Sequence, residues 1–173
     1  MYSSENHSLI PYLYMYQFFE DNIGYVLMDP KTKHLIAVDV GEFEKSSKII
    51  GELEKRHNTQ LRYILSTHHH SDHIGGNLEW LEEKKKKGQA LDIITGALDP
   101  SRIPGHTKTM GDLETMTVGD ITICCMETPG HTQGHVSFIV THVTPTSTKL
   151  PFLFCADTLF IGGCGRLLGG TAE

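Results

Sequence analysis

The chain has 173 residues, a formal net charge of -6 at pH 7 with its histidines neutral, 39% hydrophobic residues and 21% charged residues. This is the ordinary composition of a soluble globular domain, and the acidic balance argues against a nucleic-acid partner, because proteins that bind duplexes usually carry a basic patch. No apolar stretch approaches the ~20 residues that span a bilayer, and the polar first residues argue against a secretory signal, so we expect a cytoplasmic protein without a membrane partner.

The first part of the chain predicts three strands. An aromatic-rich run covers residues 12–19, and two apolar runs follow at 24–28 and 34–38. The turn signal at 29–31 makes the connection so short that we expect an antiparallel meander. Asp39 ends the third strand, where it either supports a site or is a plain turn carboxylate.

Two helices are predicted next. Residues 42–57 carry an apolar stripe and predict an amphipathic helix, and the short apolar run 61–66 predicts a strand. Residues 77–87 predict a second helix. The four lysines 84–87 could bind a nucleic acid, but acidic residues four positions before two of them favour a solvated face with i,i+4 ion pairs.

The remaining chain predicts short strands at 91–95, 120–126, 136–141 and 152–155, with 100–111 as a loop. Short strands with helices between them indicate a mixed α/β domain. Several of these strands lead into loops that are rich in ligand-type residues, which is a common layout in enzymes.

The most informative loop follows the strand at 61–66. Four ligand-type residues in the pattern His-x-His-x-Asp-His suit zinc or iron rather than calcium or magnesium, which prefer oxygen ligands alone. The alternative interpretation is a polar surface loop that happens to hold histidines. His69 occupies one of the unspecified positions of the pattern, so we interpret it as a residue that does not bind the metal. The four residues are His68, His70, Asp72 and His73.

Two further strands end in loops of this kind. One loop, 128–135, contains His131 and His135, and the other, 154–158, contains Asp157. If all three loops converge at one sheet edge, two metals ~3.5–4 Å apart need a bridging carboxylate, for which Asp157 is the natural candidate. For His135 we favour a structural hydrogen-bonding role over ligation.

The cysteines predict free thiols. No C-x-x-C pair exists, so a disulfide framework is not indicated and a cytosolic setting is the simplest interpretation. Buried structural thiols are favoured over a catalytic cysteine. The four residues are Cys124, Cys125, Cys155 and Cys164.

The three loops together resemble the metallo-β-lactamase superfamily, and within it most closely glyoxalase II, the hydroxyacylglutathione hydrolases. The resemblance implies an α/β (α+β) fold, the αββα sandwich, with one metal hydrolase domain over residues 1–173. It also implies an apparent truncation at the C-terminus, because members of the family continue to one more ligand of a second metal ion and then to a helical substrate domain. The matching stretches are 67–77, 102–105, 128–138, 155–160 and 163–166.

The resemblance also implies the chemistry. A hydroxide shared by two divalent metals, zinc foremost with iron or manganese compatible, attacks the thioester of the small-molecule partner S-D-lactoylglutathione and releases D-lactate and glutathione. The second metal site is expected to be poorly occupied in this chain. The roles implied are metal-one ligands for His68, His70 and His131, metal-two ligands for Asp72 and His73, the bridge for Asp157, catalytic carboxylates for Asp72 and Asp157, and substrate binding for Arg166.

Two alternatives stay open. A persulfide dioxygenase with one iron has a similar motif, although Arg166 in its Gly-Cys-Gly-Arg context favours the hydrolase. The chain could also be a truncated, non-catalytic metal-binding fragment. Leu168 stands where the family has an aromatic residue, so a hydrogen-bonding phenol is missing from the expected glutathione site.

Overall fold

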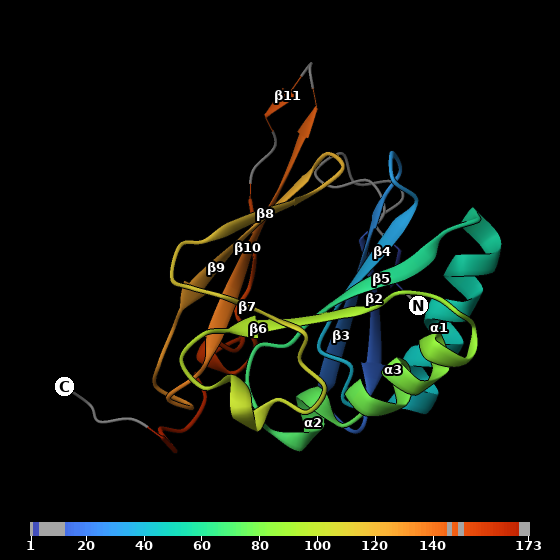
Figure 1. The fold of residues 1–173 in the computed structure, drawn as a ribbon. Helices are drawn as coiled ribbons and strands as arrows, with labels where there is room; N and C mark the ends of the chain where they lie inside the picture. Colours follow the sequence, from blue (N-terminus) through green and yellow to red (C-terminus); the bar gives the residue numbers. More distant parts are fainter. Residues whose placement is uncertain (1, 4–12, 145–146, 149–150, 170–173) are drawn as a thin grey trace.

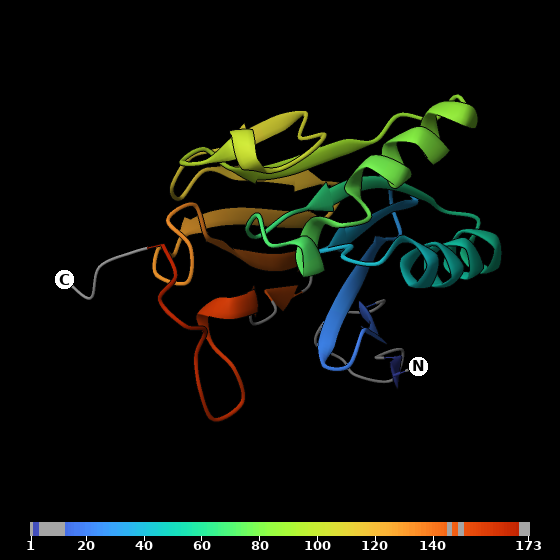
Figure 2. The same ribbon diagram turned by 90° about the horizontal axis from the view of Figure 1, so that it is seen from below.

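Two β-sheets pack face to face, and helices cover the outer face of the first (Figures 1 and 2). The computed structural model describes residues 2–3, 13–144, 147–148 and 151–169. Two longer helices, α1 (Phe43–His57) and α3 (Asn77–Lys86), lie against the first sheet, and the single turn of α2 (Ser71–Ile74) lies at the lower edge of the molecule in Figure 1. No helix in the described ranges is long and apolar enough to cross a bilayer.

The first sheet has seven strands that lie side by side in chain order. The strands β2, β3 and β4 pair antiparallel, as the short turns predict. From β4 to β7 the strands run parallel, with α1 and α3 in the crossover connections. The bounds are β1 Tyr2–Ser3, β2 Leu13–Phe18, β3 Asn22–Asp29, β4 His34–Val38, β5 Gln60–Leu65, β6 Asp92–Gly96 and β7 Lys108–Met110.

The second sheet is antiparallel throughout. Its strand order is β11-β10-β9-β8, and β12 also pairs with β10. In the described ranges no helix covers the outer face of this sheet, so those residues supply one helical layer and both sheets of the expected sandwich. The bounds are β8 Thr115–Val118, β9 Ile121–Glu127, β10 Val136–Thr144, β11 Ser147–Thr148 and β12 Phe152–Phe154.

The predicted mixed α/β fold is confirmed, and both predicted helices exist. The prediction of a loop at 100–111 is wrong in part, because a 3-10 turn (Pro100–Arg102) and the edge strand β7 lie within it. The strand β8 and the short helix α2 were not predicted either. These elements are three or four residues long, which is too short for a sequence pattern to predict them. Their structure depends instead on pairing with neighbouring strands or on the reversal of the chain.

The core has two layers, one on each face of the first sheet. Val26 packs toward the helices with Ile50 and Trp80, whereas the next residue, Leu27, packs between the sheets with Phe138. A sheet that is covered on both faces has strands with consecutive buried residues, as in β4, where every residue after His34 is buried. The ends of these strands are therefore held firmly in place.

Lys84 departs from the predicted solvated helix face. The pairs Glu82–Lys86 at 2.9 Å and Glu83–Lys87 at 2.8 Å confirm the i,i+4 prediction. Lys84 is instead fully buried and pairs with Glu54 of α1. The helix therefore presents one lysine to the core, where the opposite charge of Glu54 compensates for its burial.

A buried carboxylate joins the two sheets at the edge opposite to α2. Asp29, at the end of β3, accepts hydrogen bonds from the backbone nitrogen and the hydroxyl of Thr32, both at 2.6 Å. It also accepts a bond from the backbone nitrogen of Asp120 at 3.1 Å, in the turn between β8 and β9. One buried carboxylate thus ties a turn of the first sheet to a turn of the second.

We predict that Asp29→Ala lowers the free energy of unfolding by about 3 kcal/mol, because it removes the buried, charged acceptor of three hydrogen bonds that join turns of the two sheets. Urea unfolding followed by circular dichroism measures this. The matched control is Lys31→Ala, which removes only an exposed ion pair to Asp120 and should cost less than about 1 kcal/mol. Equal, small losses in both variants would contradict the role given to Asp29.

Candidate metal centre

Four segments that are distant in sequence meet at the lower edge of the sandwich in Figure 1. They are the end of β4 with Asp39, the loop and helix α2 after β5, the loop after β9, and the 3-10 turn Ala156–Thr158 after β12. The predicted convergence of the three ligand-rich loops at one edge is therefore found in the structure.

One group of side chains forms the centre of this edge. Its ligand-type atoms all lie within 4.8 Å of one another. His70 Nδ1 is 3.1 Å from His68 Nε2 and 2.9 Å from His131 Nε2, and Asp157 Oδ2 is 3.2 Å from His131 Nε2. Three imidazoles and one carboxylate thus point at a common volume.

Hydrogen bonds behind the rings fix which nitrogens are bare. Thr67 donates its hydroxyl hydrogen to Asp39 Oδ2 at 2.8 Å, so its oxygen accepts from His68 Nδ1 at 3.0 Å. His131 Nδ1 faces the carbonyl oxygen of Arg166 at 2.8 Å and must donate to it. In a neutral ring a hydrogen on Nδ1 leaves a lone pair on Nε2, and the single hydrogen that His70 Nδ1 can carry cannot serve both Nε2 atoms. A cation satisfies all three nitrogens at once.

A second group lies beside the first. His73 Nδ1 donates to Asp39 Oδ2 at 2.8 Å. Its buried Nε2 lies 3.2 Å from Asp157 Oδ1 and 3.4 Å from Asp72 Oδ2, but is aligned for a hydrogen bond with neither. Asn22 steadies Asp72 by donating to its Oδ2 at 3.0 Å. The two oxygens of Asp157 thus face different groups of ligand-type atoms.

Asp39 supports both groups from behind. Besides its contacts with Thr67 and His73, it accepts a hydrogen bond from the Thr67 backbone nitrogen at 2.9 Å. Its φ of 51° lies in the left-handed region, which aspartate tolerates better than most residues. The supporting role, one of the two left open for Asp39, is confirmed.

The electrostatics separate His73 from the other imidazoles. Burial and the neighbouring imidazoles lower the pKa of His68 and of His70. Burial opposes a charge on His73 too, but Asp39 and Asp157 outweigh it and raise its pKa to about 10. For Asp157, the charge of His73 outweighs burial and lowers the pKa. In the metal-free protein a proton on His73 therefore balances the carboxylates.

His135 and His69 stay outside the group. His135 Nδ1 lies 3.0 Å from the Thr128 hydroxyl and 3.2 Å from the Thr158 hydroxyl, and its ring stacks on His68 with centroids 4.8 Å apart. Burial lowers the pKa of His135 to about 4, so it is a neutral packing partner. The structural role expected for His135 is confirmed.

The cysteines are free thiols, as predicted. The expectation of buried thiols holds for Cys125, whose pKa burial raises to about 12, and is wrong for Cys164, which is exposed. Cys164 lies after β12, in a segment whose residues are mostly exposed.

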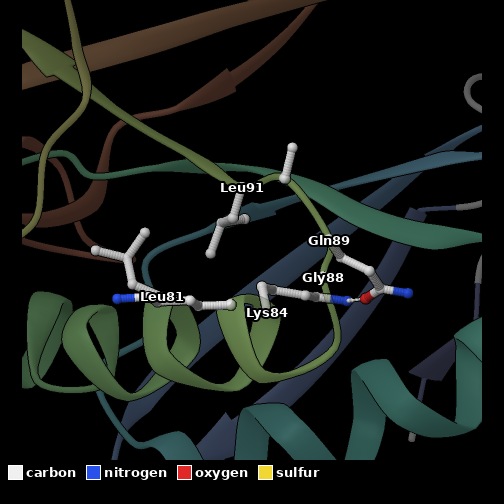
Figure 3. Close-up of a pocket in the computed structure, with 7 residues that line it drawn as sticks. Leu81, Lys84, Gly88, Gln89 and Leu91 are labelled. Carbon is white, nitrogen blue, oxygen red and sulfur yellow. Dashed lines mark hydrogen bonds between the residues drawn. The ribbon is translucent and has the colours of Figure 1, made fainter.

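A hollow of about 450 Å³ lies apart from the metal-type residues, at the C-terminal end of α3 (Figure 3). Leu81, Leu91 and Gln89 line it, and Lys84 donates to Gln89 at 3.1 Å across it. Lys84 and Gln89 are thus already paired, and the lining contains neither histidine nor aspartate. The candidate functional site is therefore the edge with α2.

We predict that the metal-free protein loses stability as pH rises from about 6.5 to 8.5. The pKa of His73 is raised from 6.5 to about 10 on folding, so its charged form contributes fully below 6.5 and is lost as pH rises through 10. Urea unfolding in a chelator across this range measures the slope. His73→Gln should flatten the slope, and an identical slope in both proteins would contradict the prediction.

The chain is similar to known proteins in sequence and in fold. Residues 25–172 match the family model of the metallo-beta-lactamase superfamily. A cytoplasmic hydroxyacylglutathione hydrolase of Arabidopsis thaliana is 36% identical over 155 residues, 89% of this chain and 55% of that protein. A hydroxyacylglutathione hydrolase of Methylococcus capsulatus is 37% identical over 154 residues, 89% of this chain and 54% of that protein. The chain spans about half the length of these curated relatives.

Solved structures share the fold at lower identity. ETHE1 from Myxococcus xanthus superposes with a TM-score of 0.68 and 19% identity, covering 88% of this chain and 61% of that chain. A metallo-beta-lactamase from Staphylococcus aureus superposes with a TM-score of 0.67 and 21% identity, covering 90% of this chain and 46% of that chain. These likenesses concern the fold alone.

Proposed function

We propose that this chain, which belongs to the metallo-beta-lactamase superfamily, is a metal-dependent thioester hydrolase domain whose substrate is S-D-lactoylglutathione. One observation carries the metal requirement: three imidazole nitrogens and a carboxylate oxygen converge, and the one hydrogen on His70 Nδ1 cannot pair with both neighbouring Nε2 atoms. The substrate class is supported by relatives named hydroxyacylglutathione hydrolase. A cytoplasmic setting, with a small molecule as partner, belongs to the same proposal.

The donor atoms divide into two sets. Histidine nitrogens with carboxylate oxygens suit zinc, with iron or manganese compatible. Asp157 belongs to both sets, because Oδ2 faces the first and Oδ1 the second. The first set would be His68, His70, His131 and Asp157, and the second would be Asp72, His73 and Asp157.

Different residues of the chain would then have different roles in the hydrolysis. When bound, divalent cations lower the pKa of water and stabilise charge on the thioester carbonyl oxygen. Asp72 and Asp157 would orient the attacking water. Water adds to the carbonyl carbon, the carbon–sulfur bond breaks, and D-lactate and glutathione leave. The exposed side chain of Arg166 would bind the glycine carboxylate of glutathione through a charge-assisted hydrogen bond.

We predict that His70→Ala and His131→Ala abolish binding at the first set, because each removes a nitrogen ligand from it. Asp157→Ala should lower occupancy of both sets. Elemental analysis of purified protein, reported as metals per chain, measures the loss. His69→Ala is the matched control, since its ring lies beside His70 but outside the group, and it should keep the wild-type metal content. Wild-type metal content in His70→Ala, His131→Ala and Asp157→Ala would count against the proposal.

We predict that the zinc-loaded chain hydrolyses S-D-lactoylglutathione, and that Arg166→Ala raises KM more than it lowers kcat. The reason is that a contact made equally in the ground and transition states changes binding alone. Loss of the thioester absorbance measures the rate.

The same preparation separates the alternatives. One iron per chain with oxygen uptake on glutathione persulfide would indicate a persulfide dioxygenase instead. Bound metal without turnover of either substrate would indicate a metal-binding fragment. Either outcome would overturn the proposed activity, and only the second would leave the protein without an enzymatic role.

A further inference from the structure

A short segment crosses two of the ligand loops. After the 3-10 turn that carries Asp157 the chain reverses, with Phe160 paired to Gly163, and returns over the loop that carries His131. We call residues 165–168 the strap. Three hydrogen bonds tie it to both loops, and none of them uses a side chain of the strap.

The three bonds connect the strap to the ligands themselves. The backbone nitrogen of Gly165 donates to the carbonyl of Asp157 at 3.0 Å, and that of Leu168 donates to the carbonyl of His131 at 3.2 Å. The third runs from His131 Nδ1 to the carbonyl oxygen of Arg166 at 2.8 Å. In the neutral ring, that last bond keeps the hydrogen on Nδ1 and leaves Nε2 bare.

The close approach requires glycine at one position. A Cβ on Gly165 would collide with the carbonyl oxygen of Asp157 and would lie 2.9 Å from His131 Nδ1. Neither atom is the free end of a flexible side chain. Gly163, two residues earlier, has open space around the same position, so the crowding is specific to Gly165.

We propose that Gly165 and the backbone carbonyl of Arg166 are positioning elements that hold His131 in the Nδ1–H tautomer and at a fixed distance from Asp157. The expected effect of these positioning elements on metal affinity rests on the function proposed above, whereas the tautomer of His131 is a property of the metal-free chain. The exposed Arg166 side chain has no part in this role, so one residue has two separable duties.

The test compares Gly165→Ala with Gly163→Ala in the full chain. Long-range ¹H–¹⁵N NMR of the metal-free protein reports the His131 tautomer, and zinc competition against a chromogenic chelator reports affinity. Wild type and Gly163→Ala should show Nδ1–H. Gly165→Ala should shift toward Nε2–H, the form favoured by free imidazole, and bind zinc roughly ten- to a hundred-fold more weakly, as losses of ligand-orienting partners do. Arg166→Ala should keep wild-type zinc affinity.

Two additions keep the test decisive. If Gly165→Ala does not fold by circular dichroism, Leu168→Pro, which removes the backbone donor to the His131 carbonyl, should weaken zinc binding in the same direction. Unchanged tautomer and affinity in the folded variant would overturn the strap proposal while leaving the hydrolase proposal intact. Absence of zinc binding by wild type would overturn the hydrolase proposal, while a tautomer shift confined to Gly165→Ala would still support the strap.

Discussion

The site depends on one buried carboxylate, that of Asp39. Its Oδ2 accepts from the Thr67 hydroxyl and from His73 Nδ1, and so fixes the tautomer of His68, through Thr67, and of His73 directly. One residue therefore fixes the orientation of a ring in each of the two donor sets and leaves the Nε2 atom of His68 bare. An unpaired carboxylate at this depth would be costly, so Asp39 is stable only while these donors are in place.

The fold supplies the rigidity that this arrangement needs. The last residues of β4 and β5 are buried, on the two faces of the sheet; Asp39 comes directly after β4, and Thr67 lies two residues after β5 ends. The carbonyl of Leu65 accepts from the Asp39 backbone nitrogen at 3.0 Å, so the two strand ends are also joined directly. Ligands that follow rigid strand ends can be held close to one another without closing around a metal first.

Sequence patterns predicted the parts of this structure that have a composition of their own. The strands β2 to β6, both longer helices and the loops with His68, His131 and Asp157 all carry an apolar pattern or a ligand pattern. The edge strands β7 and β8 escaped prediction because pairing with neighbours decides such short pieces. The buried state of Lys84 depends on Glu54, thirty positions earlier, which no local pattern reveals. The hydrogen bonds of the strap use its backbone atoms, so the glycine at 165 is the one feature of the sequence that indicates them.

The central claim is that imidazole nitrogens from two distant loops share one metal ion. X-ray absorption spectroscopy of the protein loaded with one zinc per chain tests this most directly. We predict nitrogen and oxygen scatterers at about 2.0–2.1 Å, with the outer-shell signature of several imidazoles. Sulfur scatterers at about 2.3 Å, which would place the zinc on cysteines, or a spectrum without imidazole scattering, would contradict the claim.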